Sequence, residues 1–397
     1  MRRHARVEAT VIAKSYDGVA VCCPVTEPYV RRSDHGAAWF LARALRRLLD
    51  ASGLAKPDID GLCVSSFTLQ PDTAVGFTQY VGLSPRMLEW LPMGGACGVI
   101  ALRRAARAVQ TGDAEIVACI AGDTANETSF RELLANFSSF ARDAVYPYGA
   151  GGPNASFALI ADAYMRATGA TRNDFGALAV AQRANARRND LALLRDELTL
   201  AQYLGARPIA EPLHLFDCVM PCAGADGFLV MAEARARALD LPFVRVLGTI
   251  ERHNAFPDDP VQLRGGWEMD RDALWSQAGI GPREVRLVET YDDYPVISML
   301  QFEGLGLCAP GDGPAFVRRH DFTVAGSLPH NTGGGQLSVG QAGAAGGYLG
   351  LVEAMRQLLG QAEGRQVADA RHALVSGFCM INYDRGLCSA AAVLGRA

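Results

Sequence analysis

The chain has 397 residues, of which 49% are hydrophobic and 20% charged, and its formal net charge at pH 7 is −4. This length and composition predict a globular protein with a large core, divided into two or more domain-sized lobes. The small net charge, without a basic stripe, argues against nucleic acid as a partner. Apolar runs end well before the roughly 20 residues that cross a bilayer, and no apolar segment follows the basic start MRRHARVEAT. We therefore expect a cytoplasmic protein with no membrane span.

The ten cysteines are scattered along the chain, several of them within apolar runs such as GLCVSS and EIVACIAGD. This distribution is typical of reduced, buried thiols and not of a disulfide framework. Cys218 and Cys222, in DCVMPC, are too isolated to predict a metal site. We expect these thiols to pack in the core.

Strand-like and helical stretches alternate along the chain, which is the pattern of a layered α/β fold. A helix that ends at Gly53 precedes a buried strand in KPDIDGLCVSS. A helix from about residue 99 to 110 then precedes a strand from about 116 to 121, and GAAGGYLGLVEAMRQLLG followed by DARHALVSGFC repeats that order near the C-terminus. Between about 124 and 210 we expect a helical, partly irregular insertion that covers the sheets and forms a lid or substrate pocket.

Two glycine-rich turns, Gly95-Ala-Cys-Gly98 and Gly343-Ala-Ala-Gly346, each open a helix that is followed by a strand. This internal repeat predicts two homologous halves, residues 1–240 and 241–397. Small residues at both helix starts would let the helices cross closely and bring their positive ends to one cavity, where an oxyanion can be stabilised. Close helix packing alone is the other explanation, and the matched pair favours a site.

Long segments spread over nearly the whole chain carry a family resemblance. They include GACGVIALRRAARAVQTGDAEIV, RPIAEPLHLFDCVMPCAGADGFLV, ETYDDYPVISMLQFEGLGLC and LPHNTGGGQLSVGQAGAAGGYLGLVEAMRQL. In them the chain resembles the thiolase superfamily, in particular the branch of sterol-carrier-protein-x thiolases and lipid-transfer-protein relatives. The resemblance implies an α/β thiolase fold of two similar layered α-β-α-β-α halves with an inserted helical loop domain. It also implies a homodimer that acts on acyl-CoA thioesters in lipid metabolism, with coenzyme A as part of the substrate and no separate cofactor.

The chain departs from the family at the nucleophile. A thiolase places a cysteine in a Cys-x-x-Gly context at the start of the first-half helix, where the helix end stabilises a thiolate and a covalent acyl group. Here the motif glycine matches Gly98, so Gly95 occupies the nucleophile position. Cys97 lies two positions later and is expected to be a packed thiol, unless a local shift makes it reactive.

A second departure lies in the family's Gly-His-Pro motif, which reads Gly340-Gln341-Ala342 in this chain. The amide of Gln341 can donate a hydrogen bond but cannot take a proton at neutral pH. Gln341 therefore either keeps an oxyanion-binding role or merely satisfies the backbone of the turn.

Tyr291 occupies the position at which the family has an asparagine or histidine that orients an oxyanion-binding water. A desolvated phenol there can donate a hydrogen bond or transfer a proton, although a lone tyrosine is as often structural. Asp292 and Asp293 either orient the phenol or cap the following helix. Cys379, in SGFCMINYDRGLC, lies near the position of the family's C-terminal acid/base cysteine, and His330 is a further candidate base.

These assignments give two sets of candidates. The candidate catalytic residues are Tyr291, Gln341, His330, Cys379 and Cys97, and the candidate substrate-binding residues are Gly95, Gly98, Asn331, Gly334 and Gly343.

Because Gly95 cannot form an acyl-enzyme, ordinary thiolysis is not expected. Our first hypothesis is an enzyme that makes or breaks a C–C bond in an acyl-CoA thioester by aldol chemistry, with Tyr291 as the base and Gln341, backbone amides or water at the enolate. In related aldolases a tyrosine takes the place of Gln341, and a small OB-fold and zinc-ribbon protein is the partner, so we expect such a partner here. The alternatives are an acyltransferase that uses Cys97 or Cys379 and an inactive scaffold or acyl-CoA-binding subunit.

Overall fold

The computed structural model describes residues 15–126, 132, 142–143, 146–149 and 152–397. Nine strands of this part of the chain form one mixed sheet in the order β3-β2-β4-β7-β1-β8-β11-β10-β9. The first five are β1 (Val19–Val30), β2 (Gly61–Ser65), β3 (Met87–Trp90), β4 (Ile116–Asp123) and β7 (Ala223–Ala232). The other four are β8 (Phe243–His253), β9 (Leu287–Glu289), β10 (His372–Asn382) and β11 (Arg385–Arg396). A separate short pair consists of β5 (Pro208–Ala210) and β6 (Leu213–His214).

The strand order is mirrored about the centre of the sheet, where β1 pairs antiparallel with β8 at Val21 and Val244. Outward from there, β7, β4 and β2 on one side correspond to β11, β10 and β9 on the other. β2 pairs in parallel with β3, and the matching edge of β9 carries a parallel bridge between Val288 and His330. The two halves of the sheet thus share one topology, as the internal repeat predicted.

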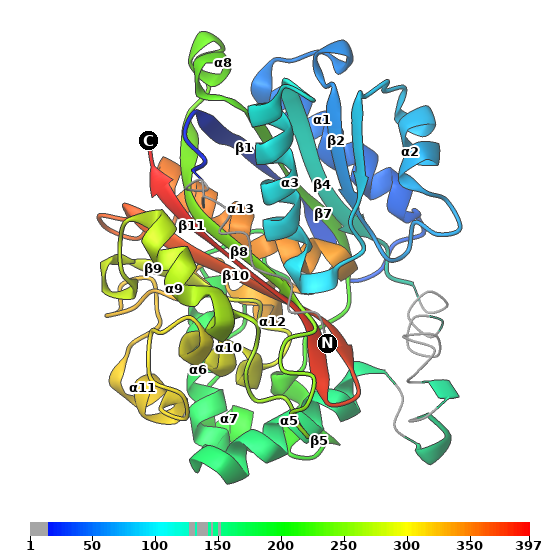
Figure 1. Ribbon diagram of the computed structural model, residues 1–397. Helices are drawn as coiled ribbons and strands as arrows, with labels where there is room; N and C mark the ends of the chain where they lie inside the picture. The colour runs from blue at the N-terminus through cyan, green and yellow to red at the C-terminus, as the bar shows by residue number, and fades with distance from the viewer. Residues whose placement is uncertain (1–14, 127–131, 133–141, 144–145, 150–151) are drawn as a thin grey trace, which may run out of the picture.

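Helices lie in three layers, one between the two halves of the sheet and one on the outer face of each half (Figure 1). The central helices, α3 and α13, contact strands of both halves. One outer layer, α1 and α2, packs on the first half, and the other, α9 and α10, packs on the second. The bounds are α1 (Ala37–Ser52), α2 (Ala74–Val81), α3 (Cys97–Thr111), α9 (Trp267–Ala278), α10 (Pro295–Gly304) and α13 (Gly346–Leu359). The predicted α/β fold of two α-β-α-β-α halves is therefore confirmed.

Glycines set the close approach of the two central helices. A Cβ on Gly98 would lie 2.2 Å from the carbonyl oxygen of Gly347, and one on Gly347 would lie 2.5 Å from that of Gly94. Both distances are too short for any side chain, so the backbones can cross only because these positions lack Cβ. The predicted close crossing of the two helix starts is confirmed, and the starts of α3 and α13 lie side by side.

The predicted insertion, residues 124–210, contributes α5 (Pro153–Thr168), α6 (Arg172–Ala186) and α7 (Leu200–Leu204), which lie at the bottom of Figure 1. Its residues 127–131, 133–141, 144–145 and 150–151 lie outside the described residues, as do residues 1–14. α6 contacts α10, α11 (Gly313–Arg319) and α12 (Gly335–Val339) of the second half. The predicted boundary between residues 240 and 241 falls between α8 (Glu233–Ala238) and β8, and the division into domains stays a prediction.

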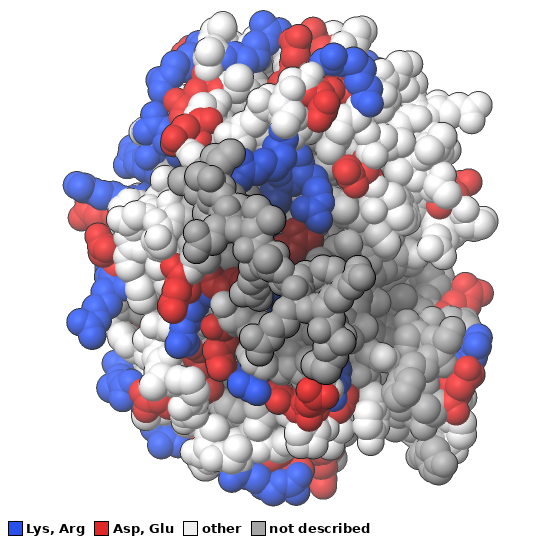
Figure 2. Space-filling view, in the orientation of Figure 1, with Lys and Arg blue, Asp and Glu red and all other residues white. Residues whose placement is uncertain are grey.

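Basic and acidic side chains are interspersed over the face shown in Figure 2. Independently of that view, Arg103 and Arg104 of α3 form ion pairs with Glu251 of β8. All ten cysteines are free thiols, as their distribution in the sequence predicted. Among the helices within the described ranges, none combines the length and the apolar character that crossing a membrane requires.

Candidate active site

The ring of Tyr291 fills the space that a side chain at position 95 would need. Tyr291 follows β9, in the loop that leads to α10, and Gly95 lies in the short 3-10 turn Gly94–Ala96 before α3. A Cβ on Gly95 would lie 2.2 Å from Cε2 of Tyr291 and 2.4 Å from the carbonyl oxygen of Phe378. A cysteine at position 95 and a tyrosine at position 291 therefore exclude each other in this backbone.

Tyr291 and Gln341 form a direct pair, in which Nε2 of Gln341 donates to the phenol oxygen at 2.9 Å. The backbone of Gln341 is held separately, because its N–H donates to Met220 and its carbonyl accepts from Cys222. The amide side chain is therefore not needed to satisfy the turn, and it is directed at the phenol. Of the two sequence interpretations of Gln341, the geometry matches hydrogen-bond donation at the site.

The environment of Tyr291 keeps its phenol protonated at neutral pH. Burial raises the pKa of Tyr291 well above its ordinary value, the negative charge of Asp293 raises it further, and the hydrogen bond from Gln341 opposes both. Burial, followed by the charge of Asp292, also raises the pKa of Asp293 well above its usual range. Asp293 is 6% exposed, and its Oδ1 has no hydrogen-bond partner among the described residues. Tyr291 and Asp293 thus form a pair in which two negative charges are unfavourable.

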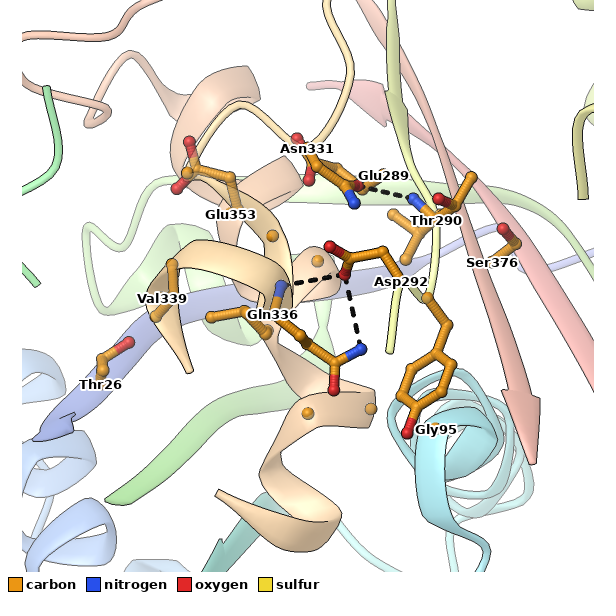
Figure 3. Close-up of a pocket in the computed structure, with 18 of the residues that line it drawn as sticks. Thr26, Gly95, Glu289, Thr290, Asp292, Asn331, Gln336, Val339, Glu353 and Ser376 are labelled. Carbon is orange, nitrogen blue, oxygen red and sulfur yellow. Dashed lines mark hydrogen bonds between the residues drawn. The ribbon is translucent and has the colours of Figure 1, made fainter. Parts of the chain in front are cut away.

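The sequence offered two roles for Asp292, orienting the phenol or capping the following helix, and its carboxylate instead bonds the backbone of α12. Its Oδ1 accepts from the backbone N–H of Gln336 at 2.9 Å and its Oδ2 from that of Leu337 at 3.3 Å, both in α12, and in Figure 3 Asp292 points toward Gln336. Burial raises its pKa to about 6. Asp292 therefore links the Tyr291 loop to α12, and α10 begins without a side-chain cap.

A small cavity lies beside Tyr291 and Gly95, and Asn331, Gln336 and Ser376 are among the residues that line it (Figure 3). Its volume is about 20 Å³, enough for one water molecule but not for an acyl chain. Nδ2 of Asn331 and Oε1 of Gln336 are buried without a hydrogen-bond partner in the described part of the chain. The small volume and the two unpaired polar groups suit one buried water, and the cavity is too small for an acyl chain.

Both candidate thiols are poor nucleophiles in this environment. Cys97 is fully buried, its Sγ donates to the carbonyl of Ala344 at 3.1 Å, and burial raises its pKa to about 12. Cys379 is 5% exposed and lies directly across the β10–β11 pair from Cys388. Burial, followed by the interaction with Cys388, raises the pKa of Cys379 well above its ordinary value. Because the thiolate is the reactive form, both side chains behave as packed thiols.

His330 is a buried core residue, and its surroundings disfavour the role of base that the sequence suggested for it. It is fully buried, its ring packs edge-on against Phe302 and Phe322 at 5.0 and 5.7 Å, and Nε2 lies 2.8 Å from Oγ1 of Thr290. Burial lowers its pKa to about 3. A histidine that resists protonation down to this pH does not exchange protons at neutral pH.

Of the five glycine and asparagine candidates for substrate binding, Gly95 and Asn331 line the small cavity. The remaining three have packing roles. Gly98 permits the helix crossing, a Cβ on Gly334 would lie 2.5 Å from Cβ of Ala186 in α6, and one on Gly343 would lie 2.2 Å from Oδ2 of Asp123.

Asp123, at the end of β4, organises the site although the sequence interpretation did not select it. Its Oδ2 accepts from the backbone N–H of Ala344 at 2.7 Å, and its Oδ1 accepts from Ser66, Phe67 and Thr68 in the loop after β2. A carboxylate from the first half thereby fixes the turn before α13 in the second half. Its position as the last residue of the buried run EIVACIAGD was the available signal.

Similarity to known proteins matches this geometry. Residues 267–390 match the family described as Thiolase C-terminal domain-like. The chain is 34% identical to the 17-hydroxy-3-oxo-4-pregnene-20-carboxyl-CoA lyase of Mycobacterium tuberculosis, over 85% of this chain and 90% of that protein. It is 31% identical to the steroid side-chain-cleaving aldolase of Thermomonospora curvata, over 84% of this chain and 87% of that protein.

Among solved structures, the Ltp2-ChsH2(DUF35) aldolase superposes with a TM-score of 0.78 at 26% identity, over 96% of this chain and 98% of that one. An SCP2-thiolase-like protein of type 1 from Mycobacterium smegmatis shares the fold, with a TM-score of 0.70 at 14% identity over 97% of this chain and 78% of that one. The chain therefore belongs to the thiolase superfamily. Within the superfamily, it belongs to the branch of SCP2-thiolase-like proteins.

Proposed function

We propose that the chain is a lyase that cleaves the Cα–Cβ bond of a β-hydroxyacyl-CoA thioester by a retro-aldol reaction, without a covalent acyl-cysteine. The observation that carries the proposal is the exchange of a nucleophile for a phenol: Gly95 has no side chain, and the ring of Tyr291 lies in its place with Gln341 bonded to the phenol oxygen. Relatives named as a carboxyl-CoA lyase and a side-chain-cleaving aldolase support the same reaction class.

In this reaction the phenolate form of Tyr291, which is the minor form at neutral pH, accepts the proton of the β-hydroxyl group, and the O–H electron pair becomes the carbonyl bond of the released aldehyde or ketone. The Cα–Cβ bond breaks, and its electrons form the enolate of the shortened thioester. The proton then passes from Tyr291 to Cα, which returns the enzyme to its starting state. Gln341 stabilises the phenolate by donating to its oxygen, and the positive ends of α3 and α13 favour the enolate oxygen.

Gln341, which bonds the phenol, is partly exposed, whereas the cavity at Tyr291 is too small for an acyl chain, so we place the approach of the substrate at Gln341. Tyr291 itself is 9% exposed. Because water has little access to the phenol, hydrogen bonds to the reacting atoms are stronger there than in bulk water.

An acyltransferase that uses Cys97 or Cys379 is disfavoured by the burial and the raised pKa of both thiols. We further propose that the chain works with a small OB-fold and zinc-ribbon partner, in line with the two-component name of the Ltp2-ChsH2(DUF35) aldolase. A homodimer, a cytoplasmic location and the absence of a separate cofactor remain part of the proposal.

The test is to copurify the protein from its host and incubate it with a panel of β-hydroxyacyl-CoA and β-ketoacyl-CoA esters, with products and intact protein followed by mass spectrometry. We expect an aldehyde or ketone from β-hydroxyacyl esters and no acylated protein. Acylation of a cysteine would establish the acyltransferase instead. Binding of esters without any product, with the partner present, would leave an inactive scaffold.

A further inference from the structure

Tyr291 lies just beyond the end of β9, and one side chain bonds both polar groups of its backbone. Oε1 of Gln301 accepts from the N–H of Tyr291 at 3.1 Å, and Nε2 of Gln301 donates to the carbonyl of Tyr291 at 2.7 Å. The amide therefore pairs with Tyr291 as a neighbouring strand would pair with a strand residue. Gln301 lies in α10 and is fully buried.

The same amide reaches two further elements. Its Nε2 also donates to the carbonyl of Ile297 at 2.9 Å, within α10, and its Oε1 also accepts from Oγ of Ser376 at 2.6 Å, on β10. All four hydrogen bonds available to a glutamine amide are thus made. The N–H of Tyr291 is shared with the carbonyl of Ser376 at 3.1 Å, so β10 also holds the loop directly.

We infer that Gln301 is a positioning residue for the reaction, which fixes the backbone of Tyr291 so that its phenol lies over Gly95 and against Gln341. The inference rests on the proposed function. Gln301 touches no reacting atom and acts through Tyr291 alone. A fully bonded buried amide is costly to disturb, since each broken bond leaves a buried polar group unpaired, and this rigidity holds the phenol within the narrow tolerance that proton transfer needs.

The chain offers a matched control in Gln357 of α13. Gln357 is also buried, and its amide bonds Thr332, Glu353 and the backbone of Arg365 and Val367. Replacement of either glutamine by methionine keeps the approximate size and removes a saturated buried amide. The two variants therefore share the general cost to stability, and they differ in whether Tyr291 is released.

For Gln301→Met we expect kcat on a β-hydroxyacyl-CoA ester to fall on the order of 10- to 100-fold, with KM changed by less than about threefold because the substrate contacts remain. Gln357→Met should lower the thermal midpoint comparably and leave kcat near that of the wild type. Ser376→Ala, which removes one anchor of Gln301 but keeps its bonds to Tyr291, should give an intermediate kcat and serves if Gln301→Met does not fold. Equal losses of kcat in Gln301→Met and Gln357→Met would overturn the inference.

A second readout does not depend on turnover. The ionisation of Tyr291 is followed by ultraviolet difference titration, with Tyr291→Phe as the blank for the other tyrosines. Release of the ring into a wetter environment should move this ionisation to lower pH in Gln301→Met and not in Gln357→Met. An unchanged titration would also overturn the inference, and absence of turnover in the wild type would count against the proposed function alone.

Discussion

Replacement of Gly95 by alanine tests whether the phenol of Tyr291 occupies the space of the missing nucleophile. The added Cβ would lie 2.2 Å from Cε2 of Tyr291 and 2.4 Å from the carbonyl oxygen of Phe378. Ordinary carbon–carbon contact needs about 3.5 Å, so the ring has to move by roughly 1 Å or the turn has to open. Overpacking of this kind costs about 1–3 kcal/mol of stability, and a shift of about 1 Å at a catalytic group lowers the rate on the order of 100-fold.

We therefore expect Gly95→Ala to lose activity on the order of 100-fold in a steady-state assay with a β-hydroxyacyl-CoA ester, and to unfold at a lower temperature. The control is Gly76→Ala in α2, where the nearest neighbour of an added Cβ is 4.0 Å away, and where activity should be unchanged. In a Tyr291→Ala background the destabilisation by Gly95→Ala should shrink, as a double-mutant cycle of unfolding free energies measures. Wild-type activity and stability in Gly95→Ala would refute the placement of the ring.

Four further outcomes are expected. Asp293→Asn removes a charge that raises the pKa of Tyr291. The increase of kcat/KM with pH that reports ionisation of Tyr291 should therefore occur at lower pH, and an unchanged profile would show that Asp293 does not influence the phenol. Gln341→Met removes a hydrogen-bond donor that lowers the pKa of Tyr291, so the increase of kcat/KM with pH should occur at higher pH. Cys97→Ala should keep full turnover, and a loss above about tenfold with an intact fold would revive the acyl-enzyme route. In the unfolded chain His330 binds a proton once the pH drops below its ordinary pKa of 6.5, whereas in the folded chain it does so only near pH 3. The free energy of unfolding should therefore decrease as the pH is lowered from 6.5 to 3, and urea titrations of His330→Gln should show a smaller decrease.

The sequence predicted those parts of the fold that short stretches of residues determine. The two glycine turns marked the starts of α3 and α13, and the alternation of helix and strand predicted both halves of the sheet. The family motif register also located Gly95, Tyr291 and Gln341, which the structure brings together. Each of these features can be identified from a short pattern of neighbouring residues, without knowledge of distant contacts.

The sequence interpretation missed Asp123 and Gln301. Asp123 reaches a backbone N–H that is 221 residues away, and no local pattern reports such a contact. Gln301 was visible only as a polar residue within the apolar helix PVISMLQFEGLG. His330 lies close to a motif along the chain and is buried in the core, because closeness in sequence does not fix which face of the backbone a side chain takes.

The proposed reaction depends most on the phenol of Tyr291, so the decisive measurement is the release of aldehyde or ketone from a β-hydroxyacyl-CoA ester by the wild type and by Tyr291→Phe, with CoA-ester binding measured in parallel. We expect Tyr291→Phe to bind the ester as the wild type does and to lose turnover by about 10²- to 10⁴-fold, the usual contribution of a general base. Turnover by Tyr291→Phe at the wild-type rate would contradict the assignment of the proton transfer to this residue.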